Sequence, residues 1–234
     1  MANHSAFKVK ASSIRGALAP WRYETTLNQW IGGKAGSFRE FTANLVEVTP
    51  GESVLDLGCG TGELALMLSR RVGPTGHVAG IDLSKALVAG ARRRAKRAGL
   101  AIDYRVASIA QLPFADATVD VVVSSLVMHH LAPDVLARAV GEIRRVLRPG
   151  GRVFIIDFQS LEQAGHGHER GHAHGHQHGH AHGHRQEQPT QHGLLHDHRP
   201  VLVGLLKEAG LTDAAASPVE FGQRLEVTRG RLTT

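Results

Sequence analysis

The feature that most constrains this chain is a regular alternation of short apolar runs and helical patterns from residue 54 to residue 156. The apolar runs have the length of buried strands, and glycine turns or amphipathic patterns separate most of them. We expect strands at 54–57, 77–81, 102–106, 119–123 and 153–156, and helices at 64–68, 85–97 and 133–147. This alternation predicts an α/β fold, a parallel sheet with helices on both faces, and right-handed crossovers make it doubly wound. Ligands of such sheets bind just beyond the carboxyl ends of the strands.

Both flanks of this alternation also show structured patterns. Residues 20–48 have apolar side chains at helical spacing, interrupted at Gly32-Gly33. Residues 201–211 predict another helix, and residues 220–228 alternate as a last strand. Residues 160–193, between these parts, have almost no apolar periodicity, so we interpret them as a disordered insertion within one domain.

Composition excludes several classes of protein. Hydrophobic residues make up 42% and charged residues 21%, as in ordinary globular domains. No apolar stretch approaches the roughly 18 residues that span a bilayer, so we expect a cytoplasmic protein. The one cysteine, Cys59, excludes a disulfide framework and a zinc-thiolate finger. The net charge of +6 permits nucleic-acid binding, but aromatic residues are only 5%. A base-stacking surface is therefore not expected, and we interpret the basic run 92–97 as a solvated helix face.

A glycine-rich loop follows the first expected strand and reads Asp56-Leu57-Gly58-Cys59-Gly60-Thr61-Gly62. A dinucleotide fingerprint would need glycine at position 63, where Glu63 stands, and no lysine follows to make a P-loop. Two acids, Asp56 and Glu63, flank the loop and suit a cationic ligand. Asp82 ends the second expected strand, where a carboxylate can accept both hydroxyls of a ribose. The pattern favours a nucleoside that carries a positive group and no phosphate.

In these motifs the chain resembles class I S-adenosylmethionine-dependent methyltransferases, in particular the ubiquinone/menaquinone-biosynthesis C-methyltransferase branch. The matching segments are 54–62, 80–84, 111–114, 120–131 and 147–151. The resemblance implies a Rossmann-like, mostly parallel seven-stranded sheet whose last strand pairs antiparallel. It divides the single domain, 1–234, into a helical lid at 1–49, a cofactor-binding core at 50–158, the insertion and a C-terminal part at 194–234.

The resemblance also implies a set of cofactor-binding residues. The methionine part of S-adenosylmethionine would lie against Asp56, Gly58, Gly60 and Ser125. The nucleoside would contact Asp82 through its ribose, and Leu83, Ser108 and Ile109 around its adenine. Many relatives have an aspartate in place of Ser108, and a serine hydroxyl should bind the adenine amino group more weakly.

Methyl transfer from a sulfonium is a direct displacement, so positioning supplies most of the catalysis. A base is needed only if the acceptor must lose a proton. His129 and Asp157 are candidate catalytic residues because each lies just past a strand end, although His129-His130 also fits a structural helix start. Tyr23 is a candidate lid contact. Whether nitrogen, oxygen, carbon or sulfur is methylated stays open.

A small, possibly lipid-like organic molecule is the expected methyl acceptor. An arsenite methyltransferase would need several cysteines, so we exclude that substrate. The segment Ser124-Ser125-Leu126-Val127 lacks the motif of methyltransferases that modify amino groups of nucleic-acid bases. The alternatives that we keep are a protein or RNA methyltransferase, favoured by the positive charge, and a metal-binding or storage protein on a methyltransferase scaffold.

Histidine is in excess, with 16 copies, most of them in the insertion. Every second residue from 172 to 184 is histidine, namely His172, His174, His176, His178, His180, His182 and His184. Neutral imidazole binds Ni, Zn, Cu and Co, so we expect the insertion to bind such divalent ions in vitro. The two interpretations are a metal-linked element near the substrate entrance and a tolerated low-complexity expansion. The sequence does not predict the oligomeric state.

Overall fold

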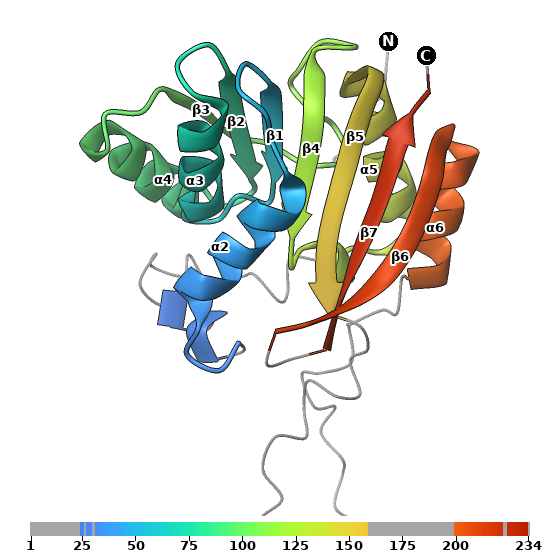
Figure 1. The fold of residues 1–234 in the computed structure, drawn as a ribbon, viewed down its shortest axis with the longest axis horizontal. Helices are drawn as coiled ribbons and strands as arrows, with labels where there is room; N and C mark the ends of the chain where they lie inside the picture. The colour runs from blue at the N-terminus through green and yellow to red at the C-terminus, as the bar shows by residue number, and fades with distance from the viewer. Residues whose placement is uncertain (1–23, 26, 30, 159–198, 222–223, 234) are drawn as a thin grey trace, which may run out of the picture.

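The computed structural model describes residues 24–25, 27–29, 31–158, 199–221 and 224–233. They form a seven-stranded sheet in the order β3-β2-β1-β4-β5-β7-β6 (Figure 1). The strands are β1 Ser53–Leu57, β2 His77–Asp82, β3 Ile102–Val106, β4 Val119–Ser125, β5 Leu147–Phe158, β6 Leu211–Glu220 and β7 Arg224–Leu232. β1 to β5 pair in parallel, and β7 is antiparallel to both of its neighbours. The predicted fold class is confirmed.

Helices cover both faces of the sheet (Figure 1). They are α2 Ala35–Val46, α3 Glu63–Val72, α4 Lys85–Arg97, α5 Pro133–Val146 and α6 Arg199–Glu208, with a 3₁₀ turn, η1, at Met128–His130. Val54 and Val78 pack toward α3 and α4, whereas Leu55 packs in the cluster that contains α5 and α6. Burial on both faces explains why the central strands read as continuous apolar runs.

The C-terminal part differs from its prediction. The helix expected to reach Leu211 ends at Glu208, and Gly210 follows with a φ of +83°, a conformation that stops helices. Leu211 instead begins β6, a strand that the sequence pattern did not locate. β6 is an edge strand with mostly exposed residues, so it lacks the alternation of a half-buried strand and tolerates Pro218. The last strand, expected at 220–228, is β7 and lies further along the chain.

The described residues of the N-terminal segment are largely helical, as predicted, and Gly32 and Gly33 interrupt them with φ values of +63° and +80°. The amide of Ala35 donates to Asn28 Oδ1 at 3.1 Å, which ties the two helical pieces together. Leu27, Ile31, Ala35 and Phe38 pack with Leu126, Ile156, Leu225 and Val227 in one apolar cluster. This packing seats the segment on β5, β7 and the residue that follows β4.

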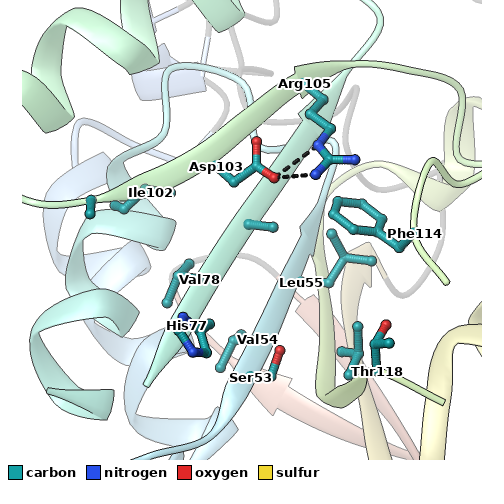
Figure 2. A pocket seen from close by; sticks show the side chains of 13 residues that line it. Ser53, Val54, Leu55, His77, Val78, Ile102, Asp103, Arg105, Phe114 and Thr118 are labelled. Carbon is teal, nitrogen blue, oxygen red and sulfur yellow. Dashed lines mark hydrogen bonds and ion pairs between the residues drawn. The ribbon is translucent and has the colours of Figure 1, made fainter. Parts of the chain in front are cut away.

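A hollow of about 520 Å³ lies on the sheet face where β1, β2 and β3 begin (Figure 2). Asp103 and Arg105 pair beside it at 2.6 Å, and the Arg105 guanidinium lies 4.7 Å from the Phe114 ring centroid. No helix lies between β3 and β4 in this described stretch, which leaves the face open there. The hollow is at the amino ends of the strands and so is separate from the predicted site.

Candidate active site at the carboxyl ends of the strands

The carboxyl ends of the parallel strands bring the predicted polar residues to one edge of the sheet. Asp56, Asp82, Ser125 and Asp157 stand at or next to the ends of β1, β2, β4 and β5. Asp56 is 2% exposed and pairs in register with Gly80 and Val123 on either side. The four side chains come from different strands, so the topology alone gathers them.

The glycine loop after β1 is held by the end of β2. The amides of Gly58 and Cys59 both donate to the Ile81 carbonyl at 2.8 Å, and the Gly60 amide donates to Asp82 Oδ2 at 3.0 Å. Gly58 has a φ of +73°, and a Cβ there would lie 2.5 Å from a methyl carbon of Val127. Gly58 is thus required by the turn and by close packing, whatever ligand the loop binds.

Asp82 holds the glycine loop in place through hydrogen bonds that need no ligand. Its Oδ1 accepts the Ser84 amide at 2.8 Å, while its Oδ2 accepts the Gly60 amide. Burial raises the pKa of Asp82, and these two donors oppose the rise. Each carboxylate oxygen has a second lone pair, so acceptor capacity remains for ribose hydroxyls. Leu83 beside it is 53% exposed, which is unusual for leucine, so its side chain is available to pack against an apolar face of a ligand.

Asp56 is the least satisfied polar group in the described part of the chain. Its Oδ2 is the buried side-chain oxygen that has no hydrogen-bond partner among the described residues. Burial, and then the charge of Asp82, raise the pKa of Asp56 to about 7, and the charge of Arg39 lowers it. A buried carboxylate oxygen without a donor is costly, so a cationic group placed against it would be bound favourably.

The far side of the loop is supported by β3 and α4. Tyr104 donates its hydroxyl to the Gly62 carbonyl at 2.9 Å, and Arg94 donates to the Thr61 carbonyl at 3.1 Å. Arg94 also pairs with Glu63 at 2.6 Å, so Glu63, expected to face a cationic ligand, already has a cationic partner. Arg92 donates to the Tyr104 carbonyl. The solvated-face interpretation of the basic run holds for Arg92, which is exposed, but it is wrong for half-buried Arg94, which braces the loop.

The remaining predicted cofactor residues lie in the turn after β3 and at the end of β4. Ser108 Oγ accepts the Ala110 amide at 3.2 Å, so this hydroxyl also forms the turn. Ile109 is 8% exposed and packs in the core, which leaves little of its side chain for a ligand. Ser125 is half-buried. Cys59 is buried and its thiol pKa is raised, mainly by that burial, which argues against a nucleophilic role.

His129 and Asp157 form a closely coupled pair. His129 Nδ1 lies 2.5 Å from Asp157 Oδ1, and the His129 amide donates to Asp157 Oδ2 at 3.0 Å. The imidazole is buried, and the Phe158 ring meets it edge-on at 5.4 Å between centroids. Partial desolvation and then the neighbouring His129 lower the pKa of His130 to about 4, so this exposed imidazole is neutral at pH 7. A carboxylate on Nδ1 assigns Nε2 as the nitrogen that can exchange a proton with a substrate.

Sequence reasoning missed three residues that meet above the glycine loop. Arg39 Nη2 donates to both carboxylate oxygens of Glu24, at 3.0 and 2.9 Å, and Thr61 Oγ1 donates to Glu24 Oε1. The Arg39 side chain is only 13% exposed. Arg39 follows the core residue Phe38 on the face of a helix, and this mixed pattern gave no signal. The predicted lid contact, Tyr23, lies outside the described residues.

The fold, the glycine loop and the two acidic strand ends together resemble those of S-adenosylmethionine-dependent class I methyltransferases. Residues 54–151 match the family model described as a methyltransferase domain.

Three proteins illustrate this similarity. An arsenite methyltransferase of Halobacterium salinarum is 41% identical over 128 residues, which cover 54% of this chain and 31% of the relative. The ubiquinone/menaquinone biosynthesis C-methyltransferase UbiE of Ralstonia pickettii is 32% identical over 142 residues, covering 61% of this chain and 58% of the relative. A methyltransferase structure from Aquifex aeolicus, with 22% identity and a TM-score of 0.60, covers 83% of this chain and 89% of its own and shares the fold. The predicted resemblance is confirmed.

The matches have clear bounds. The chain spans 39%, 31% and 58% of the first three curated relatives that it matches. Within the described residues, no helix combines the length and apolarity that crossing a bilayer requires. No group of three or more potential metal ligands occurs in that same part of the chain. The histidines predicted to bind metal, from His172 to His184, lie outside it.

Proposed function

We propose that the protein transfers a methyl group from S-adenosylmethionine to a small organic acceptor with an apolar body. The observation that carries this proposal is the pair of acidic strand ends beside the glycine loop. Asp56 keeps one buried oxygen without a donor, and Asp82 keeps acceptor capacity next to exposed Leu83. A ligand that combines an ammonium group, a ribose and an adenine fits these three features together.

The residues divide the work of binding. Asp82 accepts the ribose hydroxyls, Leu83 packs on the adenine, and the main chain of Gly58 and Gly60 allows the amino-acid part to approach closely. Ser108 and Ile109 form the turn at the adenine edge, and Ser125 lies toward the methionine end. When bound, the cofactor supplies a methyl group already activated on a sulfonium. Asp56 offers its unpartnered oxygen to the ammonium group of the amino-acid part.

The His129–Asp157 pair supplies the base that the acceptor needs when it must lose a proton. Asp157 holds His129 through both its Nδ1 and its amide, which fixes the orientation of the ring. The same carboxylate stabilises the imidazolium that forms when Nε2 accepts the proton. The neutral neighbour His130 adds no competing positive charge at pH 7.

Aromatic side chains beside this pair and on the N-terminal apolar cluster favour an acceptor with an apolar body. Phe158 contacts His129, and both Phe158 and Phe221 pack against the cluster that contains Phe38. Names of similar proteins agree with this class of acceptor, since they include a 2-phytyl-1,4-naphtoquinone methyltransferase and a geranyl diphosphate methyltransferase. Arsenite stays outside the proposal despite the similar arsenite methyltransferase, because the single cysteine of this chain is buried.

The two alternatives have weaker support. A protein or RNA methyltransferase is favoured only by the positive net charge, and Arg94 of the basic run braces the loop instead of facing a partner. The hypothesis of a metal-binding or storage protein on this scaffold does not explain the unpartnered buried oxygen of Asp56. Incubation of a metabolite extract with labelled cofactor, before and after protease and nuclease treatment, separates these cases. Labelled small molecules that survive both treatments support the proposal, whereas labelled macromolecules alone contradict it.

The cofactor site is tested by substituting Asp82. We expect Asp82→Ala to weaken S-adenosylhomocysteine binding at least about tenfold, since two hydrogen bonds to a charged acceptor are lost. Calorimetry measures the affinity, and thermal unfolding checks that the fold survives the loss of the Gly60 and Ser84 contacts. Asp103→Ala is the matched control, because Asp103 is an exposed acid on β3 beside the separate hollow. Equal affinities of the Asp82→Ala variant and the wild type would contradict the assignment.

The histidine tract forms a second part of the proposal, based on its sequence. We expect the full chain to bind Ni²⁺ or Zn²⁺ in vitro, with binding lost when residues 165–185 are deleted, because neutral imidazoles are good ligands for both ions. Equilibrium dialysis measures the bound metal, and a methyl-transfer assay with and without metal measures any effect on turnover. A metal response that both chains share would exclude a regulatory role for the tract.

A further inference from the structure

Glu24, Arg39 and Asp56 place alternating charges above the glycine loop. Arg39 contacts Glu24, and it lies close enough to Asp56 for its charge to act on that carboxylate. Asp56 Oδ2 nevertheless has no hydrogen-bond partner among the described residues. A free amino acid carries an ammonium and a carboxylate on one carbon, so its receptor needs an anion and a cation side by side. Asp56 and Arg39 meet that requirement.

The cation of this receptor is already engaged by a carboxylate of the chain itself. Both hydrogen bonds that Glu24 accepts from Arg39 come from the same nitrogen, Nη2. The other nitrogens of Arg39 have no hydrogen bond within the described residues, so the paired fork geometry of arginine with a carboxylate is not used. Thr61, in the glycine loop, donates its hydroxyl to the same Glu24 carboxylate. The Glu24 carboxylate therefore occupies the position, on an arginine and a loop hydroxyl, that the carboxylate of an amino-acid ligand would occupy.

We propose that Glu24 is an internal competitor whose carboxylate holds, on Arg39 and Thr61, the place that the α-carboxylate of the cofactor takes. This inference rests on the proposed function, because it assumes the same cofactor. Binding displaces Glu24 and transfers Arg39 and Thr61 to the incoming carboxylate. The N-terminal segment is thereby coupled to occupancy of the site, since Glu24 belongs to that segment and Thr61 to the loop.

A ligand carboxylate can displace Glu24 from Arg39 at low cost. The side chains of Arg39 and Glu24 are only 13% and 26% exposed, so the cost of removing both charges from water offsets much of their attraction and the net stabilisation is small. The incoming carboxylate gains an advantage because its own ammonium reaches the unpartnered oxygen of Asp56. Glu24 has no such group and satisfies only the Arg39 half of the receptor. Competition of this kind lowers the apparent affinity for the ligand without changing the site.

Calorimetry with two ligands tests the inference. S-adenosylhomocysteine carries the amino-acid group, and 5′-methylthioadenosine has the same nucleoside and sulfur without it. We expect Glu24→Gln to bind S-adenosylhomocysteine about two- to fivefold tighter, as expected on removal of a weakly paired competitor. Arg39→Met should bind it about ten- to a hundredfold more weakly, because a charge-assisted hydrogen bond is lost. Binding of 5′-methylthioadenosine should change less than about twofold in both variants.

Two controls and the opposite outcomes complete the test. Glu40→Gln removes an equal charge from an exposed position beside Arg39 and should change neither affinity. Arg39→Lys should restore part of the S-adenosylhomocysteine affinity that Arg39→Met loses. Weaker or unchanged binding of S-adenosylhomocysteine by Glu24→Gln, or an equal loss of both ligands in Arg39→Met, overturns the competitor role alone. A wild-type protein that binds neither ligand overturns the proposed cofactor and this inference with it.

Discussion

Asp56→Asn is expected to make the protein more stable and to impair its cofactor site. The Asp56 carboxyl has a reference pKa of 3.8 and a pKa of about 7 in the folded protein, chiefly because burial disfavours its charge. At pH 8 the difference corresponds to about 4 kcal/mol of unfolding free energy that the ionised group forfeits. A neutral amide of the same shape avoids that cost, so we expect a gain of about 2–4 kcal/mol at pH 8 by urea unfolding.

The sign of the pH dependence follows from proton binding. Between pH 4 and pH 7 the unfolded chain has lost the Asp56 proton and the folded chain keeps it, so stability falls as pH rises. Above pH 7 both forms are ionised and the effect levels off. The stability gain of Asp56→Asn should therefore be large at pH 8 and small at pH 4. Asp103→Asn, at an exposed position, serves as the control and should show no such trend.

The same carboxyl should govern the pH dependence of cofactor binding. An ammonium group pairs with ionised Asp56, so wild-type affinity for S-adenosylhomocysteine should fall by about tenfold per pH unit below pH 7. Calorimetry in buffers of different ionisation enthalpy should detect about one proton released per ligand at pH 6. Asp56→Asn should bind at least about tenfold more weakly at pH 8 and lose this dependence. Wild-type affinity that is constant from pH 5 to pH 8 would refute the role of Asp56.

The degree to which burial constrains each residue explains which parts of this protein could be predicted from its sequence. The central strands are buried on both faces, so their apolar runs identified the sheet and its order of elements. Asp56 and Asp82 interrupt those runs at strand ends, where a polar residue has few structural reasons, and the sequence pattern marked them clearly. β6 left no such signal, since an exposed edge strand has no buried face to impose alternation.

Interactions between distant segments escaped the sequence for a different reason. Glu24 and Thr61 are 37 positions apart, and nothing local to either residue specifies the other. The bracing of the loop by Arg94 likewise depends on how α4 packs beside the β1–α3 loop, a tertiary arrangement that converts a surface charge into a structural one. The pairing of His129 with Asp157 joins β5 to η1 across 28 positions. Sequence reasoning proposed both residues separately, and only the fold shows that they contact each other.

This pair is the basis of the second large prediction. His129→Gln is expected to lower kcat by about 10²- to 10⁴-fold for an acceptor that loses a proton, because the variant lacks the base that accepts this proton. Asp157→Asn keeps a hydrogen-bond acceptor but removes the charge that stabilises the imidazolium, so a smaller loss of kcat is expected. In both variants the affinity for S-adenosylhomocysteine should stay within about twofold of the wild type, since neither residue is assigned to the cofactor.

The neighbouring histidine offers a matched control for this second prediction. His130→Gln changes an identical side chain one position away whose pKa of about 4 makes it unsuited to hold a proton at pH 7. It should leave kcat within about tenfold of the wild-type value. Equal losses in His129→Gln and His130→Gln, together with equal losses of thermal stability, would show that the pair only packs the start of η1. A loss confined to His129 and Asp157, with cofactor affinity retained, identifies them as the groups that move the proton.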